Sequence, residues 1–210
     1  MIKLYDHPLS GNCYKIRLFL TQAQIEFETE VVDVFKGENK SDDFIRINPA
    51  AKIPAIEDDG EILWESNAIL FYLCEKYSPI LLPYDLKGRA EAYQWMFFNK
   101  TSVDPFLAKA RAILKFFPKE SQDLEELALL QKQGINSLKI LENHLVNKAF
   151  FVENYSIVDI AYYPYIKLCS EGNISLDRFP SILEWITCLL YTSDAADEGL
   201  GVDLGGRRII

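Results

Sequence analysis

The apolar and polar positions of the first 77 residues alternate between short strand-like and short helical stretches. An apolar run ends before Pro8 and Gly11 and is followed by helical spacing, and a later pair of runs flanks the tight turn Asp58-Asp59-Gly60. Strands are expected at 2–5, 27–34, 53–57 and 61–64, and helices at 12–23, at 42–46 as a single turn, and from 65 onward. The 27–34 run alternates as a half-buried strand does. This order predicts a small α/β domain over residues 1–77.

The rest of the chain has a helical pattern. Residues 78–85 are punctuated by prolines and are expected to be a linker. Helical spacing then covers 86–100, 107–116 and 124–145, and Pro105 and Pro118 are expected to end the first two helices. Ser156, with Asp159 three residues later, is a capping arrangement in front of an aromatic helix. A last helix is expected at 181–187, so residues 86–187 form an all-helical domain.

The composition changes abruptly at Cys188. Residues 188–210 hold four of the ten glycines and show no lasting helical or strand period. Their first six residues, CLLYTS, are encoded in frame by TGT-CTC-TTA-TAC-ACA-TCT, which resembles a transposase-type sequencing adapter. We therefore expect the natural sequence to stop near Thr187, with 188–210 a non-native artefact and the helical domain truncated.

Composition and charge narrow the class of protein. The chain has 210 residues, 49% of them apolar, and a net charge of −9, which argues against a nucleic-acid-binding face. No apolar run reaches the length of a membrane span, and the N-terminus carries no signal-like segment, so a cytoplasmic protein is expected. The four cysteines form no Cys-x-x-Cys motif and there are only two histidines, so no metal site is expected.

Two junctions between strands and helices carry polar side chains. Ser10 lies where the first strand turns into the first helix, and Glu65-Ser66 lies where a later strand does the same. Free backbone N–H groups and the helix dipole favour anions at such helix N-termini. Both junctions are therefore candidate anion-binding positions.

Three segments together point to a known family. They are KLYDHPLSGNCYKIRLFL, INPAAKIPAIEDDGEILWESNAILFYL and YSIVDIAYYPYI. In this order and spacing they resemble cytosolic glutathione S-transferases of the bacterial theta/beta/nu-like kind, over residues 1 to about 187. The resemblance implies an α/β thioredoxin-like N-terminal domain, an all-α C-terminal domain, a homodimer, and glutathione as co-substrate.

The resemblance also implies roles for individual residues. Ser10 matches the family hydroxyl that donates to the glutathione sulfur, and Asn12 is the alternative donor. A thiol of pKa near 8.5 needs about 2.7 kcal/mol of differential stabilisation to lose two pKa units, which one charge-assisted hydrogen bond and a helix dipole can supply. The expected glutathione contacts are backbone groups of Ile53 before a cis Pro54, Glu65 for the γ-glutamyl ammonium, Ser66 for its carboxylate, and Lys40 and Lys52 for the glycine carboxylate. Asn39 stands where the family often has histidine, and its amide could still donate.

The second substrate is expected in an apolar cleft between the domains. The helices that would line it carry Phe97, Lys100, Val103, Phe106 and Arg111, with Phe98 and Asp104 on the same helices. Cys13 falls inside the first helix and is expected to pack.

Three functions remain open from the sequence. The first is a transferase that adds the glutathione thiolate to an electrophilic small molecule. A close alternative is a glutathione-dependent disulfide-bond reductase that uses Asn12 and a hydroxyl without a redox cysteine of its own. The third is a non-catalytic scaffold with the same fold. An enzyme is favoured because the residues expected to contact glutathione are all present, namely Lys52, Ile53, Pro54, Glu65 and Ser66.

Overall fold

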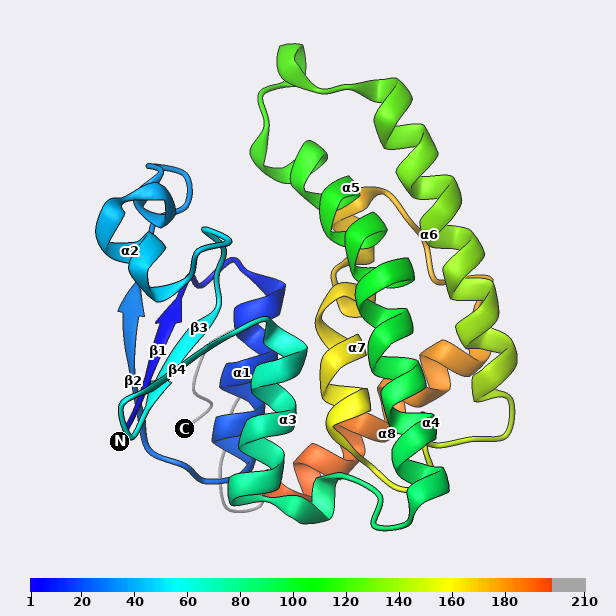
Figure 1. The fold of residues 1–210 in the computed structure, drawn as a ribbon. Coiled ribbons are helices and arrows are strands. Elements are labelled where there is room, and N and C mark those ends of the chain that lie inside the picture. The colour runs from blue at the N-terminus through cyan, green and yellow to red at the C-terminus, as the bar shows by residue number, and fades with distance from the viewer. Residues whose placement is uncertain (198–210) are drawn as a thin grey trace.

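The structure is a computed structural model that describes residues 1–197 of the chain (Figure 1). The strands are β1 (Ile2–Asp6), β2 (Phe27–Val31), β3 (Ala55–Asp58) and β4 (Glu61–Trp64). The helices are α1 (Gly11–Gln22), α2 (Asp42–Ile47), α3 (Ser66–Tyr77), α4 (Leu86–Phe98), α5 (Asp104–Phe116), α6 (Leu124–Leu145), α7 (Ile157–Lys167) and α8 (Pro180–Asp197). Together they form a four-stranded mixed sheet with its own helices, followed by a helical half, as predicted.

The sheet has the strand order β2-β1-β3-β4. β1 runs parallel to β2 and antiparallel to β3, and β3 and β4 form the predicted hairpin. Asp59 and Gly60 close that hairpin with φ values of 52° and 85°, the left-handed pair that a tight two-residue turn needs. Helices α1 and α3 lie between the sheet and the helical half, and α2 lies apart from them near the other side of the sheet (Figure 1).

Alternate residues of the central strands face two different cores. Leu4 and Ile56 are fully buried in the main core with α1 and α3. Tyr5 and Ala55, one residue along each strand, are buried in a smaller cluster with Phe44 of α2. This is the two-residue period of a strand covered on both faces.

The edge strand β2 departs from the prediction. It ends at Val31 rather than residue 34, and its side chains from Glu28 to Val31 are exposed rather than half-buried. It pairs only with β1 in the sheet, so one edge faces outward. A turn follows at Asp33, whose Oδ1 accepts hydrogen bonds from the backbone N–H groups of Phe35 and Lys36.

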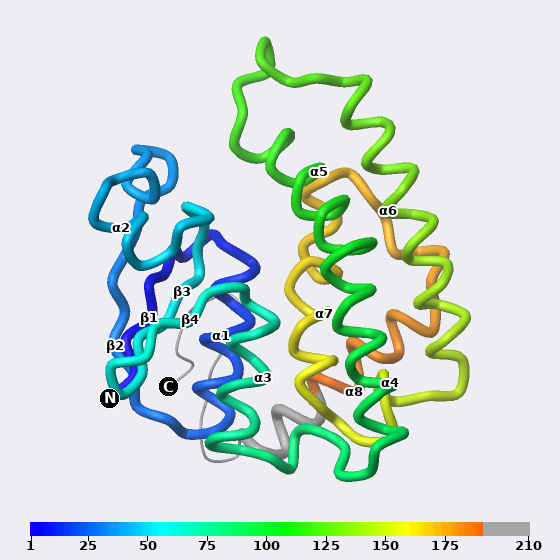
Figure 2. The backbone as a smooth tube through the Cα atoms, in the orientation of Figure 1, coloured from blue at the N-terminus to red at the C-terminus, as the bar shows by residue number. Residues whose placement is uncertain are grey.

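The α4 and α5 helices are joined without a loop. Pro105 was expected to break a helix, but the chain continues from α4 through a π-helical turn, Asn99–Val103, directly into α5 (Figure 2). Pro105 lies in the first turn of α5, where its missing N–H costs little hydrogen bonding. α6 covers 124–145 as predicted.

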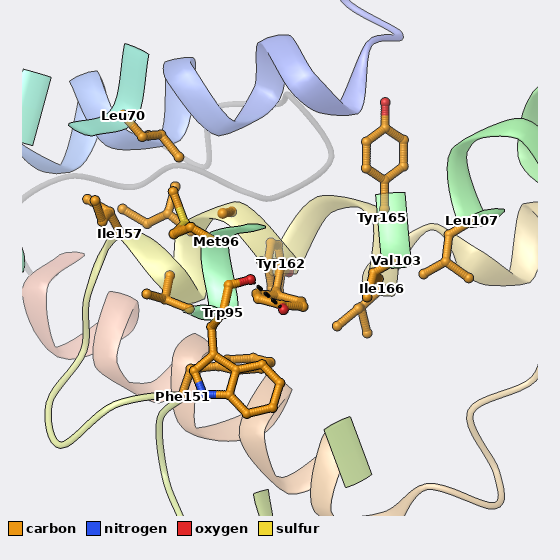
Figure 3. Close-up of a cluster of buried hydrophobic side chains, with 14 of the residues drawn as sticks. Leu70, Trp95, Met96, Val103, Leu107, Phe151, Ile157, Tyr162, Tyr165 and Ile166 are labelled. Atoms are coloured by element: carbon orange, nitrogen blue, oxygen red, sulfur yellow. Dashed lines mark hydrogen bonds between the residues drawn. The ribbon is translucent and has the colours of Figure 1, made fainter. Parts of the chain in front are cut away.

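One apolar core runs from the sheet helices into the helical half. It joins residues such as Leu70 of α3, Met96 of α4 and Ile157 of α7, all of which Figure 3 draws. Tyr162 of α7 is fully buried within it, and its hydroxyl donates to the Trp95 carbonyl at 2.8 Å. The core therefore holds α3, α4 and α7 against one another.

The predicted cap of α7 is confirmed as a capping box. The Ser156 hydroxyl accepts from Val158 N, and the Asp159 carboxylate accepts from Ser156 N. Asp159 is fully buried and also accepts from Phe151 N at 3.1 Å and Trp185 Nε1 at 2.8 Å. Asp159 therefore connects α7 to the preceding loop and to α8.

The last helix is longer than predicted. α8 begins at Pro180 and continues to Asp197, ten residues into the segment expected to have no regular structure. Leu189 and Leu190 pack against the main core, which supplies the apolar contact that extends the helix. Residues 198–210 lie outside the described residues, and the non-native origin of 188–210 stays a prediction.

The predicted linker at 78–85 contains a short 3-10 helix, Pro79–Leu81, between α3 and α4. The domain boundary drawn there stays a prediction. Among residues 1–197, no helix is both long enough and apolar enough to cross a bilayer.

His144 gives the helical half a pH-dependent stability. Its ring packs on Trp95 with centroids 4.1 Å apart, its Nε2 lies 2.7 Å from the Phe151 carbonyl, and its Nδ1 lies 3.3 Å from Lys148 Nζ. Burial lowers the pKa of His144, with nearby Lys148 acting the same way. The unfolded chain then binds a proton more readily, so stability should fall as pH drops below about 6.5.

Urea unfolding between about pH 7.5 and about pH 5.5 measures this effect. We expect His144→Phe, which stacks but does not titrate, to lose less stability over that range than the wild type. Equal losses in the two proteins would rule out His144 as the source.

Candidate functional site

Ser10 caps the N-terminus of α1. Its Oγ accepts a hydrogen bond from Cys13 N at 3.2 Å, and its own N–H donates to the His7 carbonyl at 2.9 Å. The cap uses a lone pair of the hydroxyl oxygen, so the hydroxyl proton can still be donated. No acidic residue lies in the first turn of α1 to compete for the helix dipole.

α3 begins with a strained residue and a buried serine. Glu65 has φ 71° and ψ 108°, an unfavourable backbone conformation that typically costs about 1–3 kcal/mol in a non-glycine residue. Its side chain is exposed and does not cap the helix. Ser66 is only 2% exposed, and the first N–H groups of α3 have no partner within the helix. The N-terminus of α3 is therefore uncapped, and the exposed Glu65 carboxylate lies beside it.

The two helix N-termini meet. Ser66 Oγ donates to Asn12 Oδ1 at 3.1 Å, which joins the start of α3 to the first turn of α1. The Asn12 amide nitrogen remains able to donate elsewhere. Two helix dipoles and two side-chain donors, Ser10 and Asn12, are thus gathered at one place.

The segment before β3 presents a backbone edge. The Ile53–Pro54 peptide bond is cis, as predicted. Ile53 lies two residues ahead of Ala55, where the ladder with β1 begins, and it is half-buried. Asn48 holds this segment, because its Nδ2 donates to the Lys52 carbonyl at 2.6 Å and its Oδ1 accepts from Ala50 N at 2.9 Å.

An apolar cleft of about 400 Å³ opens beside Ser10. It is lined by His7, Leu9, Ser10, Val34, Phe35, Pro105, Ala108, Lys109, Arg111, Ala112, Phe116, Phe117 and Tyr165. These residues come from the loop after β1, the loop after β2, α5 with the residue that follows it, and α7. Figure 3 shows Tyr165 at the edge of the core, with its hydroxyl directed away from the other labelled side chains.

The chain is similar to known proteins over most of its length. Residues 1–75 match the family "Glutathione S-transferase, N-terminal domain". The disulfide-bond oxidoreductase YfcG of Escherichia coli K12 is 34% identical over 193 residues, which cover 88% of each chain. The chain belongs to the glutathione S-transferase family. Human glutathione S-transferase theta-1 is also similar, at 32% identity over 76% of this chain and 69% of its own.

Solved structures of the family have the same architecture. A glutathione S-transferase from Pseudomonas fluorescens superimposes with a TM-score of 0.83 at 38% identity, covering 89% of this chain and 92% of its own. A glutathione transferase from Pseudomonas putida, solved with glutathione disulfide bound, gives 0.79 at 28% identity, covering 89% and 85%.

Three other residues expected to contact glutathione lie in the segment between β2 and β3. They are Asn39, Lys40 and Lys52. Lys40 and Lys52 are both exposed, and neither forms an ion pair with another described residue. Asn39 contacts the segment that precedes Ile53. Its Nδ2 donates to the Ala51 carbonyl at 2.7 Å, and its Oδ1 is buried without a hydrogen-bond partner. The hydrogen bond holds Ala51, which has φ 52°, and the second N–H of the amide can still be donated, so the role of Asn39 toward glutathione stays a prediction.

The predicted second-substrate set is mostly not at the cleft. Of its five residues, Arg111 lines the cleft. Val103 is fully buried in the core, Phe97 is 71% exposed, and Lys100 Nζ lies 3.8 Å from Asp104. Phe106 packs toward Gly134 of α6. Lys100 and Val103 lie within the π-helical turn, where side chains point in directions that differ from those of a continuous α-helix.

A buried polar network behind the two helix N-termini was not predicted from the sequence. Lys15 Nζ lies 2.5 Å from Asp104 Oδ2 and 3.3 Å from Asn99 Oδ1, and its side chain is fully buried. Asn67, next to Ser66, donates to Asn99 Oδ1 at 3.2 Å. Burial lowers the pKa of Lys15 to about 8, and the Asp104 carboxylate opposes that shift. A lysine within the apolar stripe of a helix was the available signal.

Cys13 packs as predicted. It is fully buried, and burial raises the pKa of its thiol to about 12. The thiolate is therefore negligible near neutral pH, and Cys13 is unsuited to redox or nucleophilic chemistry. Among the described residues, no group of three or more His, Cys, Asp or Glu side chains is arranged to hold a metal ion.

Proposed function

We propose that the chain is a glutathione transferase that binds glutathione, stabilises its thiolate and adds it to an electrophilic small molecule. The observation that carries this proposal is the Ser66–Asn12 hydrogen bond of 3.1 Å. It brings the N-termini of α1 and α3 together beside the Ile53 backbone edge. Glutathione combines an anionic end, a peptide-like centre and a thiol, and these features match that arrangement.

Binding uses the groups around α3. The γ-glutamyl carboxylate is held by the free N–H groups of α3, beginning with that of Ser66, and the ammonium by the exposed Glu65 carboxylate. The central peptide pairs with the Ile53 backbone in the manner of an added strand. Lys40 and Lys52 attract the glycine carboxylate.

Thiol activation uses the start of α1. The Ser10 hydroxyl donates to the sulfur, and the α1 dipole favours the negative charge. The Asn12 Nδ2 is the alternative donor, because its Oδ1 is already bound to Ser66. In the reaction the sulfur forms a bond to the electrophilic carbon, the leaving group departs with its bonding electrons, and the thiol proton passes to solvent.

A second candidate is a glutathione-dependent disulfide-bond reductase. The similarity to YfcG and the inert, buried Cys13 favour it as the alternative. One glutathione thiolate would attack the substrate disulfide, and a second would release the remaining thiol, giving glutathione disulfide and two substrate thiols. Two assays with glutathione separate the two reactions. Turnover of 1-chloro-2,4-dinitrobenzene reports the transferase, and turnover of 2-hydroxyethyl disulfide reports the disulfide-bond reductase. A non-catalytic scaffold would turn over neither.

We further propose that the protein is a cytoplasmic homodimer, as the family resemblance implies. Apolar side chains available for a subunit interface include Trp64 on β4 and Phe97 on α4, which are 39% and 71% exposed. Light scattering on the purified protein tests the oligomeric state.

Ser66→Ala is expected to weaken glutathione binding roughly tenfold, because it removes the hydrogen bond to Asn12 Oδ1 that holds the N-termini of α1 and α3 together, and leaves the backbone N–H groups in place. Titration calorimetry with glutathione measures the change. Ser137→Ala, a buried serine of α6, is the matched control and should bind as the wild type does. A wild type that binds no glutathione would reject the proposed function.

A further inference from the structure

Four of the side chains that line the cleft form a continuous row. The His7 and Phe35 rings are 5.3 Å apart, the Phe35 and Phe116 rings 5.1 Å apart, and the Arg111 guanidinium lies 5.0 Å over the Phe116 ring. His7 and Phe35 belong to the sheet domain, and Phe116 and Arg111 belong to α5. The row therefore bridges the two halves of the chain.

The loop that carries Phe35 is held by its own hydrogen bonds. Asp33 Oδ1 accepts from Phe35 N at 3.0 Å and from Lys36 N at 3.2 Å, and Glu38 Oε2 accepts from Asp33 N at 2.7 Å. Gly37 takes the left-handed φ of 79° that closes the turn. The loop thus places the Phe35 ring without help from the second domain.

The other end of the row is anchored more firmly. Arg111 is 6% exposed, and it donates to Glu171 Oε2 at 2.6 Å and to the Leu9 carbonyl at 2.9 Å. Phe35 is 56% exposed despite its two ring contacts. Phe35 is therefore the member of the row that can move away at least cost.

We propose that Phe35 is a specificity-determining residue that closes the outer side of the cleft against Phe116 and limits the size of the second substrate. This rests on the proposed function, since the cleft lies beside Ser10. A substrate that fits beneath the row gains contact with the rings, whereas a larger one must separate Phe35 from Phe116. An aromatic contact of this kind is worth roughly a two- to tenfold change in an equilibrium.

The test uses glutathione derivatives that place a group in the cleft without turnover. S-methylglutathione, S-(4-nitrobenzyl)glutathione and S-(9-fluorenylmethyl)glutathione carry substituents of increasing size, and calorimetry gives the Kd of each. In Phe35→Ala we expect the affinity for the fluorenylmethyl derivative, relative to the nitrobenzyl one, to rise roughly three- to tenfold. S-methylglutathione should bind as before.

Further variants separate size selection from a general effect. Phe116→Ala should shift the ratio in the same direction, and the double variant should shift it no further than the larger single change. Phe35→Tyr should keep the wild-type ratio, and Tyr84→Ala, an aromatic residue 87% exposed in the linker, should not change it.

Two outcomes count against the proposal in different ways. An unchanged ratio in Phe35→Ala, with S-methylglutathione still bound, overturns the role of Phe35 and leaves the proposed function standing. Failure of the wild type to bind S-methylglutathione overturns both.

Discussion

Replacing Lys15 with Met is expected to lower the free energy of unfolding by about 3–5 kcal/mol, because it leaves a buried carboxylate without its partner. Asp104 is 3% exposed, and its Oδ2 lies 2.5 Å from Lys15 Nζ. Its other oxygen accepts from Asn99 Nδ2 at 2.9 Å, which satisfies only part of the charge. Lys100 Nζ forms a longer ion pair with Asp104 Oδ2, at 3.8 Å, which is beyond hydrogen-bond distance.

Urea unfolding of wild type and Lys15→Met measures this loss. Lys132→Met, an exposed lysine on α6, is the matched control and should change stability by less than about 0.5 kcal/mol. Adding Asp104→Asn to Lys15→Met should recover part of the stability, because it removes the unpaired charge. A loss below about 1 kcal/mol in Lys15→Met would show that the Lys15–Asp104 pair does not hold α1 to α5.

Ser10→Ala is expected to lower kcat/KM for glutathione conjugation roughly 100-fold near pH 7, because the bound thiol loses the hydrogen bond that favours its ionised form. The loss should shrink as pH rises toward the pKa of the free thiol, about 8.5. A pH profile of kcat/KM therefore separates thiol activation from damage to the fold, which would lower the rate at every pH.

Two comparisons make the Ser10 result specific. Ser41 caps α2 with the same geometry, its Oγ accepting from Phe44 N at 3.2 Å, so Ser41→Ala controls for the loss of a helix cap. Asn12→Ala tests the alternative donor, and a large pH-dependent loss there with a small one in Ser10→Ala would assign activation to Asn12. If both Ser10→Ala and Asn12→Ala had the same pH profile of kcat/KM as the wild type, neither residue would be the activating donor.

Local signals predicted much of the fold. The 124–145 helix, the Asp59-Gly60 hairpin turn and the Ser156–Asp159 capping box each depend on residues within a few positions of one another, and each is confirmed. The cis bond before Pro54 was expected from the family resemblance and is also confirmed.

The parts that were missed depend on contacts between distant segments. Lys15 and Asp104 are 89 residues apart, and no local pattern indicates that they pair. The cleft-lining residues depend on the π-helical turn 99–103, where a one-residue change in helical pairing turns later side chains to another face. Phe35 lies in a loop after an edge strand, and its contact with Phe116 exists only when the two halves pack.

The thiol pKa of glutathione bound to the wild-type protein measures directly whether the protein stabilises the thiolate. Ultraviolet difference absorbance of the thiolate, followed against pH with saturating glutathione, gives that value beside the value for free glutathione. We expect the pKa of the bound thiol to be lowered by about two units, equivalent to about 2.7 kcal/mol of preference for the thiolate. Binding of glutathione with an unshifted thiol pKa would contradict it.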